Sequence, residues 1–308
     1  MTRRQFCAAS AGAAAGVILG GTRPSFGEPI QPSGFRLNYI VSATMYGTTP
    51  LAEVLPEVRK AGAAAIDIWP LPHGNHREQI DAIGVDQVAT LFETHQVRLG
   101  AITRYDLGPY RICEELPLLE RLGGRLLVCG AARQGGDSEK ERVQKFVERM
   151  KPHVAMAEEN GVTIGIENHG GTILNTPSAV RYFAEYATSP KLGIALAPYH
   201  LPQDPHAIGR LIGDLGDKLV FFQAWEHGQG CSEKLPKEQE MMQLPGRGAL
   251  DFAPLLAALR KINYPGYTEI FMHPMPRGVP IHDTTDAVTA EIRQARDYLE
   301  RCFAKLPA

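Results

Sequence analysis

The stretch Gly161-Val-Thr-Ile-Gly-Ile-Glu-Asn-His-Gly-Gly171 joins a short apolar run to a group of polar side chains. Residues 162–166 are apolar and largely β-branched, which is typical of a strand buried on both faces in a parallel sheet. Glu167, Asn168 and His169 follow at once, and barrel enzymes carry their chemistry at that end of each strand. We therefore predict a buried strand that delivers these three residues to a site. An exposed loop acid followed by a turn former is the alternative interpretation of Glu167 and Asn168.

Short apolar runs alternate with amphipathic segments along the chain from about residue 36. The pattern predicts strands over residues 36–42, 64–69, 97–103, 125–129, 162–166, 192–196, 219–224 and 268–271. It predicts helices over residues 51–61, 85–95, 112–122, 138–159, 176–186, 207–215, 251–262 and 286–303, with Pro152 expected to kink or break the fourth. Eight strands alternating with helices predict a single (β/α)8 TIM barrel. An open doubly wound sheet is the alternative, but no GxGxxG follows the first strand.

The first thirty residues differ in composition from the rest of the chain. Arg3 and Arg4 precede a small, weakly apolar run over residues 7–21, which is the layout of a secretory signal and resembles a twin-arginine signal. We expect residues 1–30 to be an export signal that is cleaved, and residues 31–308 to form the barrel domain. The mature protein would then be exported, with the periplasm as its expected location. A basic N-terminal helix packed on the domain is the alternative.

Charge and cysteine content exclude several classes of function. The 32 basic residues nearly balance 34 acidic ones, so no charge excess indicates nucleic acid as a partner. No apolar run of about 18 residues follows the N-terminus, and a membrane span is not expected. The five cysteines show no CxxC or other metal spacing, and we expect buried or idle thiols. These features leave open whether the protein forms a homo-oligomer.

Polar residues that follow the predicted strands would share one rim of a closed barrel. They are Tyr46, Asp67, His73, Arg104, Asp106, Glu167, Asn168, His169, His200, Gln223, Glu226, His227, Glu269 and His273. Carboxylates and imidazoles that converge from several strands are what a divalent metal site requires. Taken singly, Asp67 or His200 is equally compatible with a capping or loop role.

Four motifs resemble the xylose isomerase-like TIM barrels, the superfamily of sugar (phosphate) isomerases and epimerases that also contains endonuclease IV. The resemblance covers residues 36–305 approximately and rests on Ile164-Gly-Ile-Glu-Asn-His169, Leu192-Gly-Ile-Ala-Leu-Ala-Pro-Tyr-His200, Pro245-Gly-Arg-Gly248 with Asp251-Phe252, and Tyr264-Pro-Gly-Tyr-Thr-Glu269. It implies a barrel that acts on a small-molecule carbohydrate. An endonuclease role is the least expected, because it requires several metals and a basic DNA-binding face.

The resemblance also implies one divalent ion (Mn, Mg, Co or Zn) held by Glu, Asp, His and Glu from the last four strands. The two glutamates correspond to Glu167 and Glu269, but the aspartate position falls on Ala197 and the histidine position on Gln223. Alanine offers no ligand, and a glutamine carbonyl is a weaker one than imidazole. Tentative further ligands are therefore His200, Gln223, Glu226 and His227.

The expected function is a sugar isomerase or epimerase in which Glu167 and Glu269 transfer a proton next to a carbonyl, with or without a metal. Expected substrate-binding residues are Asn168, His169, Arg104, Trp69, Tyr46 and Trp225, since aromatic side chains suit the apolar faces of sugar rings. Two alternatives remain: a metal-poor carbohydrate-binding barrel without catalysis, and a keto-sugar or inositol lyase (dehydratase). The segment Gly246-Arg247-Gly248 is a further candidate, as a cradle for an anion.

Overall fold

The fold was obtained as a computed structural model, which describes residues 34–307 of the 308-residue chain. The export signal predicted for residues 1–30 lies outside the described residues.

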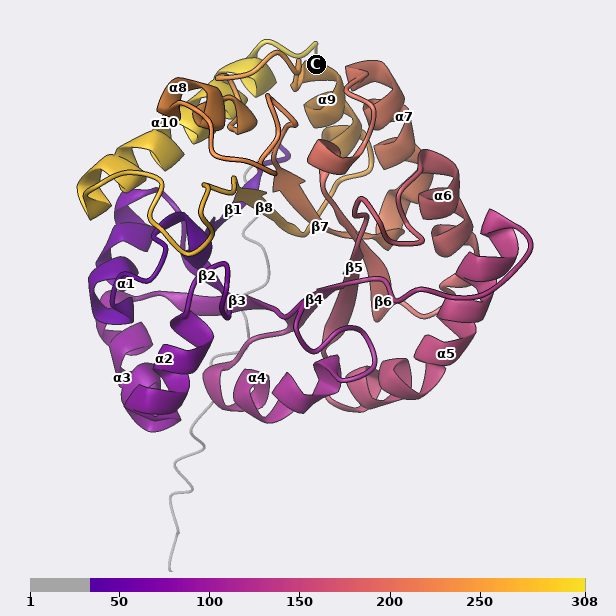
Figure 1. The fold of residues 1–308 in the computed structure, drawn as a ribbon, viewed down its shortest axis with the longest axis horizontal. Helices are drawn as coiled ribbons and strands as arrows, with labels where there is room; N and C mark the ends of the chain where they lie inside the picture. The colour runs from indigo at the N-terminus through magenta and orange to yellow at the C-terminus, as the bar shows by residue number, and fades with distance from the viewer. Residues whose placement is uncertain (1–33, 308) are drawn as a thin grey trace, which may run out of the picture. The chain divides into compact units, whose positions relative to one another are not determined.

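Eight parallel strands form a closed barrel in the order of the sequence, with β8 pairing with β1 (Figure 1). Their bounds are β1 Asn38–Ser42, β2 Ala65–Ile68, β3 Arg98–Thr103, β4 Leu126–Gly130, β5 Thr163–Glu167, β6 Leu192–Leu196, β7 Leu219–Ala224 and β8 Tyr267–Ile270. The predicted TIM barrel is therefore confirmed, with each strand within two residues of its predicted ends. Parallel strands covered on both faces need continuous apolar runs, and these runs made the strands visible in the sequence.

Helices form an outer ring around the strands (Figure 1). Their bounds are α1 Leu51–Lys60, α2 His76–Ile83, α3 Val85–His95, α4 Leu116–Leu122, α5 Glu139–Glu159, α6 Pro177–Tyr186, α7 Pro205–Leu215, α8 Lys237–Glu240, α9 Ala253–Lys261 and α10 Thr285–Ala304. Short 3₁₀ turns lie at Ala43–Met45, Ile112–Glu115, Pro198–His200, Gly216–Lys218 and Met241–Gln243. Helix α2 was missed in the sequence, and the long polar segment after β7 contains α8.

The local sequence explains how helix α5 ends and the chain enters strand β5. Helix α5 begins where the Ser138 hydroxyl accepts a hydrogen bond from the Glu141 N–H at 3.1 Å, an N-cap. The helix continues unbroken through Pro152, so the predicted break is wrong. It ends at Glu159, and Gly161 adopts a φ of +65°, which a side chain would strain. The chain then turns directly into β5.

The barrel interior is built in layers, because residues two apart on a strand point to the same face. The layer toward the amino ends is apolar and consists of Ile40, Ala65, Ala101, Leu126, Val128, Ala195 and Phe221. Two positions further along the strands come polar side chains, namely Ser42, Asp67, Thr103, Gln223 and Glu269, all buried. Two positions further again come Trp69, Trp225 and Phe271, also buried. The barrel thus buries a polar layer between an apolar layer and an aromatic one.

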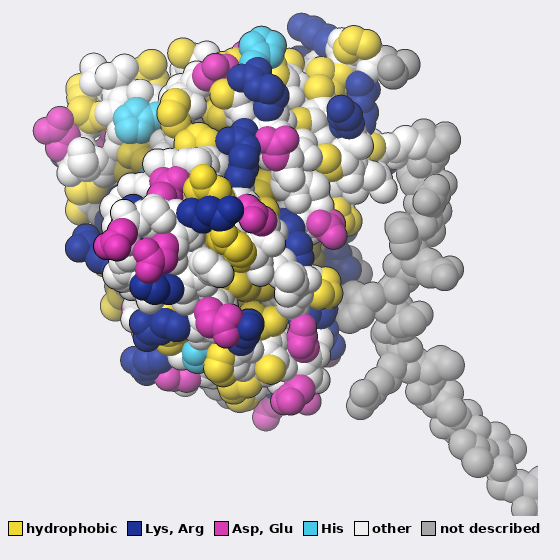
Figure 2. Space-filling view, turned by 90° about the vertical axis from the view of Figure 1, so that its right-hand side faces the viewer, with side chains coloured by type: hydrophobic (Ala, Val, Ile, Leu, Met, Phe, Trp, Pro, Cys, Tyr) yellow, Lys and Arg dark blue, Asp and Glu magenta, His cyan; other side chains and the backbone are white. Residues whose placement is uncertain are grey.

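The outer surface carries charges of both signs. On the face shown in Figure 2, Lys and Arg side chains are interspersed with Asp and Glu and do not gather into one basic field. Within residues 34–307, no helix is long and apolar enough to span a bilayer. Cys113, Cys129 and Cys231 are buried as free thiols, and Cys302 is a partly exposed one.

Candidate active site

A cavity of about 620 Å³ lies at the carboxyl ends of the strands. Its wall contains Trp69, His73, Tyr105, Gly130, Glu167, His169, Thr172, Tyr199, His200, Trp225, Cys231, Phe271, His273 and Arg277. Small-molecule sites of proteins have volumes of roughly 300–1,000 Å³ and combine apolar walls with a few polar groups. This cavity matches that description, and it occupies the end of the barrel where TIM-barrel chemistry takes place.

Glu167 is the one Asp or Glu among the residues that line the cavity. Its Oε1 lies 3.5 Å from His200 Nε2, while its Oε2 is buried without a hydrogen-bond partner. Burial raises the pKa of Glu167 to about 8 and lowers the pKa of His200 to about 4. Near neutral pH the pair therefore holds one proton and no net charge. The His169 ring stacks on His200 at 4.0 Å between centroids, and its Nδ1–H donates to the Gly170 carbonyl at 2.6 Å.

Aromatic rings form the adjoining part of the wall, where Tyr199 and Trp225 contact the His200 ring at 4.7 and 5.2 Å between centroids. Trp69 stacks on Phe271 with centroids 5.2 Å apart, Phe271 meets Trp225 edge-on at 4.9 Å, and Trp225 stacks on Tyr199 at 3.9 Å. The Trp225 indole N–H donates to Gln243 Oε1 at 3.0 Å, which fixes that ring. Trp69 and Trp225, which were predicted to bind substrate, both line the cavity. Their apolar ring faces suit a sugar.

Glu269 is placed below this aromatic wall and does not line the cavity. Phe271 follows two residues later, one residue beyond β8, and unlike Glu269 it lines the cavity. Glu269 Oε2 accepts a hydrogen bond from Gln223 Nε2 at 3.1 Å, and its carboxyl group also hydrogen-bonds to the Asp67 carboxyl. Asp67 Oδ2 in turn accepts from the Trp69 indole N–H and the Thr103 hydroxyl, both at 2.7 Å.

This buried carboxyl pair holds a proton. Burial, followed by the charge of Asp67, raises the pKa of Glu269 well above its usual range, and burial raises the pKa of Asp67 to about 7. Two carboxyl groups in contact inside a protein share a proton, because both cannot be charged at once without a cation. Glu269 is consequently a neutral acid that donates to Asp67.

The donor set does not fit the four-ligand metal site that the resemblance implies. Ala197 has no donor atom, and the Gln223 amide group is a donor to Glu269. Of the predicted ligands, Glu167 and His200 line the cavity, whereas Gln223 and Glu269 are buried outside its wall. Within residues 34–307, no group of three or more His, Cys, Asp or Glu side chains is arranged to hold a metal ion.

Asn168 and Tyr46, both predicted to bind substrate, serve the scaffold. The Asn168 side chain accepts from the Ala197 N–H at 2.8 Å and donates to the Ala197 carbonyl at 3.0 Å, which ties the end of β5 to the end of β6. Tyr46 is fully buried, and its hydroxyl shares a hydrogen bond of 2.9 Å with Thr289 of α10. Neither residue lines the cavity.

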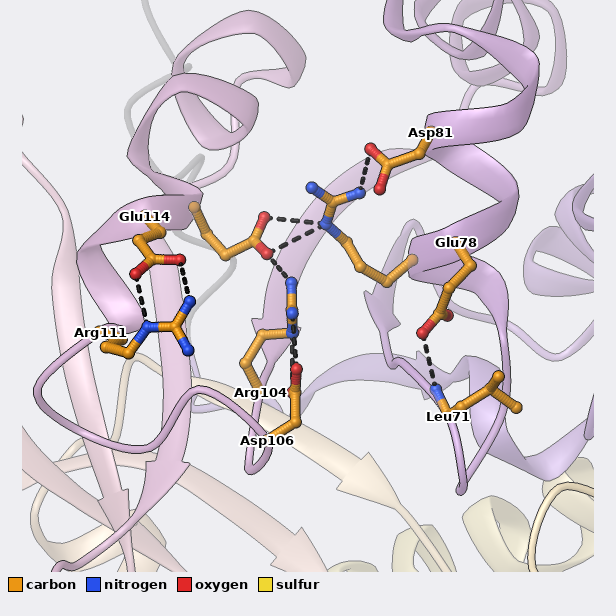
Figure 3. A network of polar contacts seen from close by, with 9 residues as sticks. Leu71, Glu78, Asp81, Arg104, Asp106, Arg111 and Glu114 are labelled. Atoms are coloured by element: carbon orange, nitrogen blue, oxygen red, sulfur yellow. Dashed lines mark hydrogen bonds and ion pairs between the residues drawn. The ribbon is translucent and has the colours of Figure 1, made fainter.

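Arg104, predicted to bind substrate, does not line the cavity. It forms an ion pair with Asp106 at 2.6 Å (Figure 3) and contacts Glu115, which in turn pairs with Arg77 at 2.9 Å. This network links the loop after β3 to α2 and to the 3₁₀ turn before α4.

Glu226 and His227, the tentative metal ligands after β7, also lie outside the cavity wall. Glu226 Oε2 accepts a hydrogen bond from the Leu250 N–H at 2.7 Å, and the Gly248 N–H contacts it as well. The glycine segment predicted to cradle an anion thus cradles a carboxyl group of its own chain. The exposed His227 ring packs on Tyr199 at 4.8 Å, and the backbone N–H of His227 donates to Gln203 Oε1 at 2.9 Å.

Several residues of the cavity were missed in the sequence, among them Tyr199, Phe271 and Arg277. Phe271 could have been found from strand periodicity, since it stands two positions after Glu269. Tyr199 lies inside the quoted motif that ends at His200. Arg277 stands several residues beyond β8, past the point at which a rim residue is expected, and no local pattern marks it.

Comparison with known proteins agrees with this architecture. Residues 55–302 match the family described as xylose isomerase-like TIM barrel. No curated protein matches the chain in sequence.

Solved structures with similar folds include the IolI protein with a bound zinc atom, with a TM-score of 0.67 and 18% identity over 88% of this chain and 100% of that one. A D-allulose 3-epimerase from Methylomonas sp. in complex with D-allulose gives 0.63 and 19% over 87% and 98%, and an L-ribulose 3-epimerase gives 0.65 and 17% over 87% and 95%. At these identities the likeness shows the fold. With the family match spanning most of its length, the chain belongs to the xylose isomerase-like TIM barrels.

Proposed function

We propose that this protein is a sugar isomerase in which Glu167 moves a proton between the carbonyl carbon of a sugar and the carbon next to it. The observation that carries the proposal is the position of Glu167, the sole carboxyl group facing an aromatic cavity, 3.5 Å from a neutral histidine. Sugar epimerases among the structurally similar proteins support the substrate class.

The proposed reaction is an aldose–ketose interconversion. The Glu167 carboxylate removes the proton from C2 of the aldose, and the C–H electron pair forms the C1–C2 double bond of an enediol while O1 takes up a proton. Glu167 then returns its proton to C1, and O2 loses a proton to become the ketone. Carbon-bound hydrogen is thus moved from one carbon to the next, and the overall reaction is balanced without an oxidant.

A neutral imidazole supplies the electrophile in this scheme. A neutral histidine can polarise a carbonyl oxygen by donating a hydrogen bond, as it does in another barrel isomerase. The His200 Nε2 lies 3.5 Å from Glu167 and has no hydrogen-bond partner, and burial lowers the pKa of His200 to about 4. His200 is therefore placed to donate to the oxygen on which charge develops.

One accessible carboxyl group favours isomerisation over epimerisation. Inversion at a carbon requires a proton to leave from one face and return on the other, which normally takes two groups on opposite sides. The second glutamate predicted for that task, Glu269, lies outside the cavity wall and is hydrogen-bonded to Asp67. A shift between adjacent carbons on one face needs Glu167 alone.

Deuterium incorporation tests the proposal. The wild-type protein is incubated with aldoses and ketoses in D₂O, and NMR follows both interconversion and exchange at the carbon next to the carbonyl. Glu167→Gln should lower both rates by about 10²- to 10⁴-fold, whereas Glu269→Gln should retain exchange. Loss of exchange in the Glu269 variant with its fold intact would favour a two-base epimerase, and exchange in Glu167→Gln at the wild-type rate would refute the proposal.

A carbohydrate-binding barrel without catalysis is the second candidate. The replacement of two expected ligand positions by Ala197 and Gln223, together with the position of Glu269 outside the cavity wall, favours it. Sugar binding by the wild-type protein without any deuterium incorporation would support this second function.

A further inference from the structure

Arg277 lies in the cavity wall on a backbone segment that is held in place. Gly278, the next residue, has a φ of +79°, and a Cβ there would lie 2.9 Å from the Pro72 carbonyl oxygen. Further along, the Ile281 N–H donates to the Met45 carbonyl at 3.0 Å. The segment after β8 is thereby packed against the segments after β1 and β2, which holds the backbone that carries Arg277.

No carboxylate in residues 34–307 forms an ion pair with Arg277. Its Nη2 donates to Cys231 Sγ at 3.4 Å, and its Nη1 is buried without a partner. The partly buried Arg77, Arg104 and Arg296 each have a carboxylate within 3 Å. A partly buried guanidinium with unused donors is costly, and it indicates that the missing partner comes from outside the chain.

The charges around Arg277 are not balanced by the cavity itself. Glu167 is its one acidic residue, and burial raises the pKa of that carboxyl to about 8. His73 and His200 are neutral, since burial and then nearby positive groups, including Arg277, lower the pKa of each to about 4. Within the described part of the chain, no acidic side chain other than Glu167 lines the cavity to balance Arg277.

We propose that Arg277 binds a carboxylate of the ligand, which makes the substrate a sugar acid. The sugar part of this inference rests on the proposed function. A guanidinium presents two parallel N–H groups that match the two oxygens of a carboxylate. Among residues 34–307, no lysine or second arginine lines the cavity, so one negative charge is matched better than the nearly doubled charge of a phosphate ester.

Calorimetric titration tests the assignment directly. The probes are the uronates of D-glucose, D-galactose and D-mannose, the three parent hexoses, and their 6-phosphates. At least one uronate should bind the wild-type protein more tightly than its hexose and its phosphate. Arg277→Gln should weaken that binding by about 10- to 100-fold, and Arg277→Lys, which keeps the charge but not the fork, by less.

Arg293→Gln is the matched control, because Arg293 is exposed on α10 and loses the same charge away from the cavity. It should leave uronate binding unchanged. The inference is overturned if no uronate binds better than its hexose, if the phosphates bind best, or if Arg277→Gln binds uronates like the wild type. Should Arg277→Gln fail to fold, wild-type preference for uronates and weakened binding in Arg277→Lys decide the matter.

This test is separate from that of the proposed function, because it measures binding and not turnover. Uronate binding that depends on Arg277 without any isomerisation would leave the inference standing and refute the isomerase. Isomerisation of uncharged sugars that depends on Glu167, with no preference for uronates, would do the reverse.

Discussion

Replacement of Glu167 by glutamine should stabilise the protein relative to wild type by an amount that grows with pH. Burial raises the pKa of Glu167 from a usual value of 4.5 to about 8, so the folded protein binds this proton more tightly than the unfolded chain. Proton binding by Glu167 stabilises the folded protein fully below pH 4.5. This stabilisation is lost at about 1.4 kcal/mol per pH unit as pH rises toward 8. Above pH 8 both states are ionised and the loss is constant.

A measurement at pH 6 and pH 9 isolates this contribution. Two pH units of the sensitive window lie between these values, so the difference in unfolding free energy between E167Q and wild type should grow by about 3 kcal/mol. In a barrel of this size that corresponds to a relative gain of roughly 6–12 °C in Tm. Other titrating groups are present in both proteins, and their contributions cancel in the difference.

Urea unfolding followed by tryptophan fluorescence provides the assay, with E233Q as a control because Glu233 is exposed. The control should differ from wild type by the same amount at both pH values. An E167Q difference that is equal at pH 6 and pH 9 would show that Glu167 is already ionised at pH 6. The reasoning about a neutral buried acid would then fail, and with it the proposed state of the site.

Further predictions concern turnover and the scaffold. Because the proposed base must be ionised to accept a proton, kcat/KM of the isomerase should rise with pH and level off above about pH 8, as a pH–rate profile would show. Trp69→Phe removes a hydrogen-bond donor from the buried Asp67 and should cost about 1–3 kcal/mol of stability in urea unfolding; an unchanged midpoint would contradict the hydrogen bond. Gly248→Ala would place a Cβ 2.3 Å from Glu226 Oε2 and should cost a similar amount of stability in urea unfolding. Gly213→Ala is the control: the space around Gly213 is open, so this variant should be neutral or stabilising in the same urea experiment.

The barrel could be predicted from the sequence because its strands are buried on both faces and its helices have one apolar stripe. These patterns are local and periodic, so each strand was located to within two residues. Helix α2 was missed because it buries only His76 and Ile80 and shows no continuous stripe. Pro152 was expected to break α5, but the surrounding turns of the helix are held by packing of its apolar face.

The site was predicted less completely, because the sequence does not show which of the side chains at the strand ends line the cavity and which are buried outside its wall. Glu167 and Glu269 both lie at strand ends, and their sequence motifs predict the same catalytic role for both. After Glu269 it is Phe271, two positions later, that lines the cavity, whereas the chain after Glu167 turns into Gly170 and Gly171. Arg277 lies in the loop after β8. The conformation of this loop depends on contacts with the segments after β1 and β2, which are distant in the sequence.

The departures from the family pattern form one consistent arrangement. A buried carboxylate without a cation costs several kcal/mol, and Glu269 avoids that cost by keeping its proton and donating to Asp67. Gln223 is suited to this neutral acid, since its amide donates to the second carboxyl oxygen as a neutral imidazole would do only in one tautomer. A position outside the cavity wall is compatible with a neutral acid and not with a metal-bound carboxylate that must face the ligand. With Glu269 outside the cavity wall, Glu167 is the acid that lines the cavity within residues 34–307, and the proposed proton transfer on one face of the sugar rests on this asymmetry.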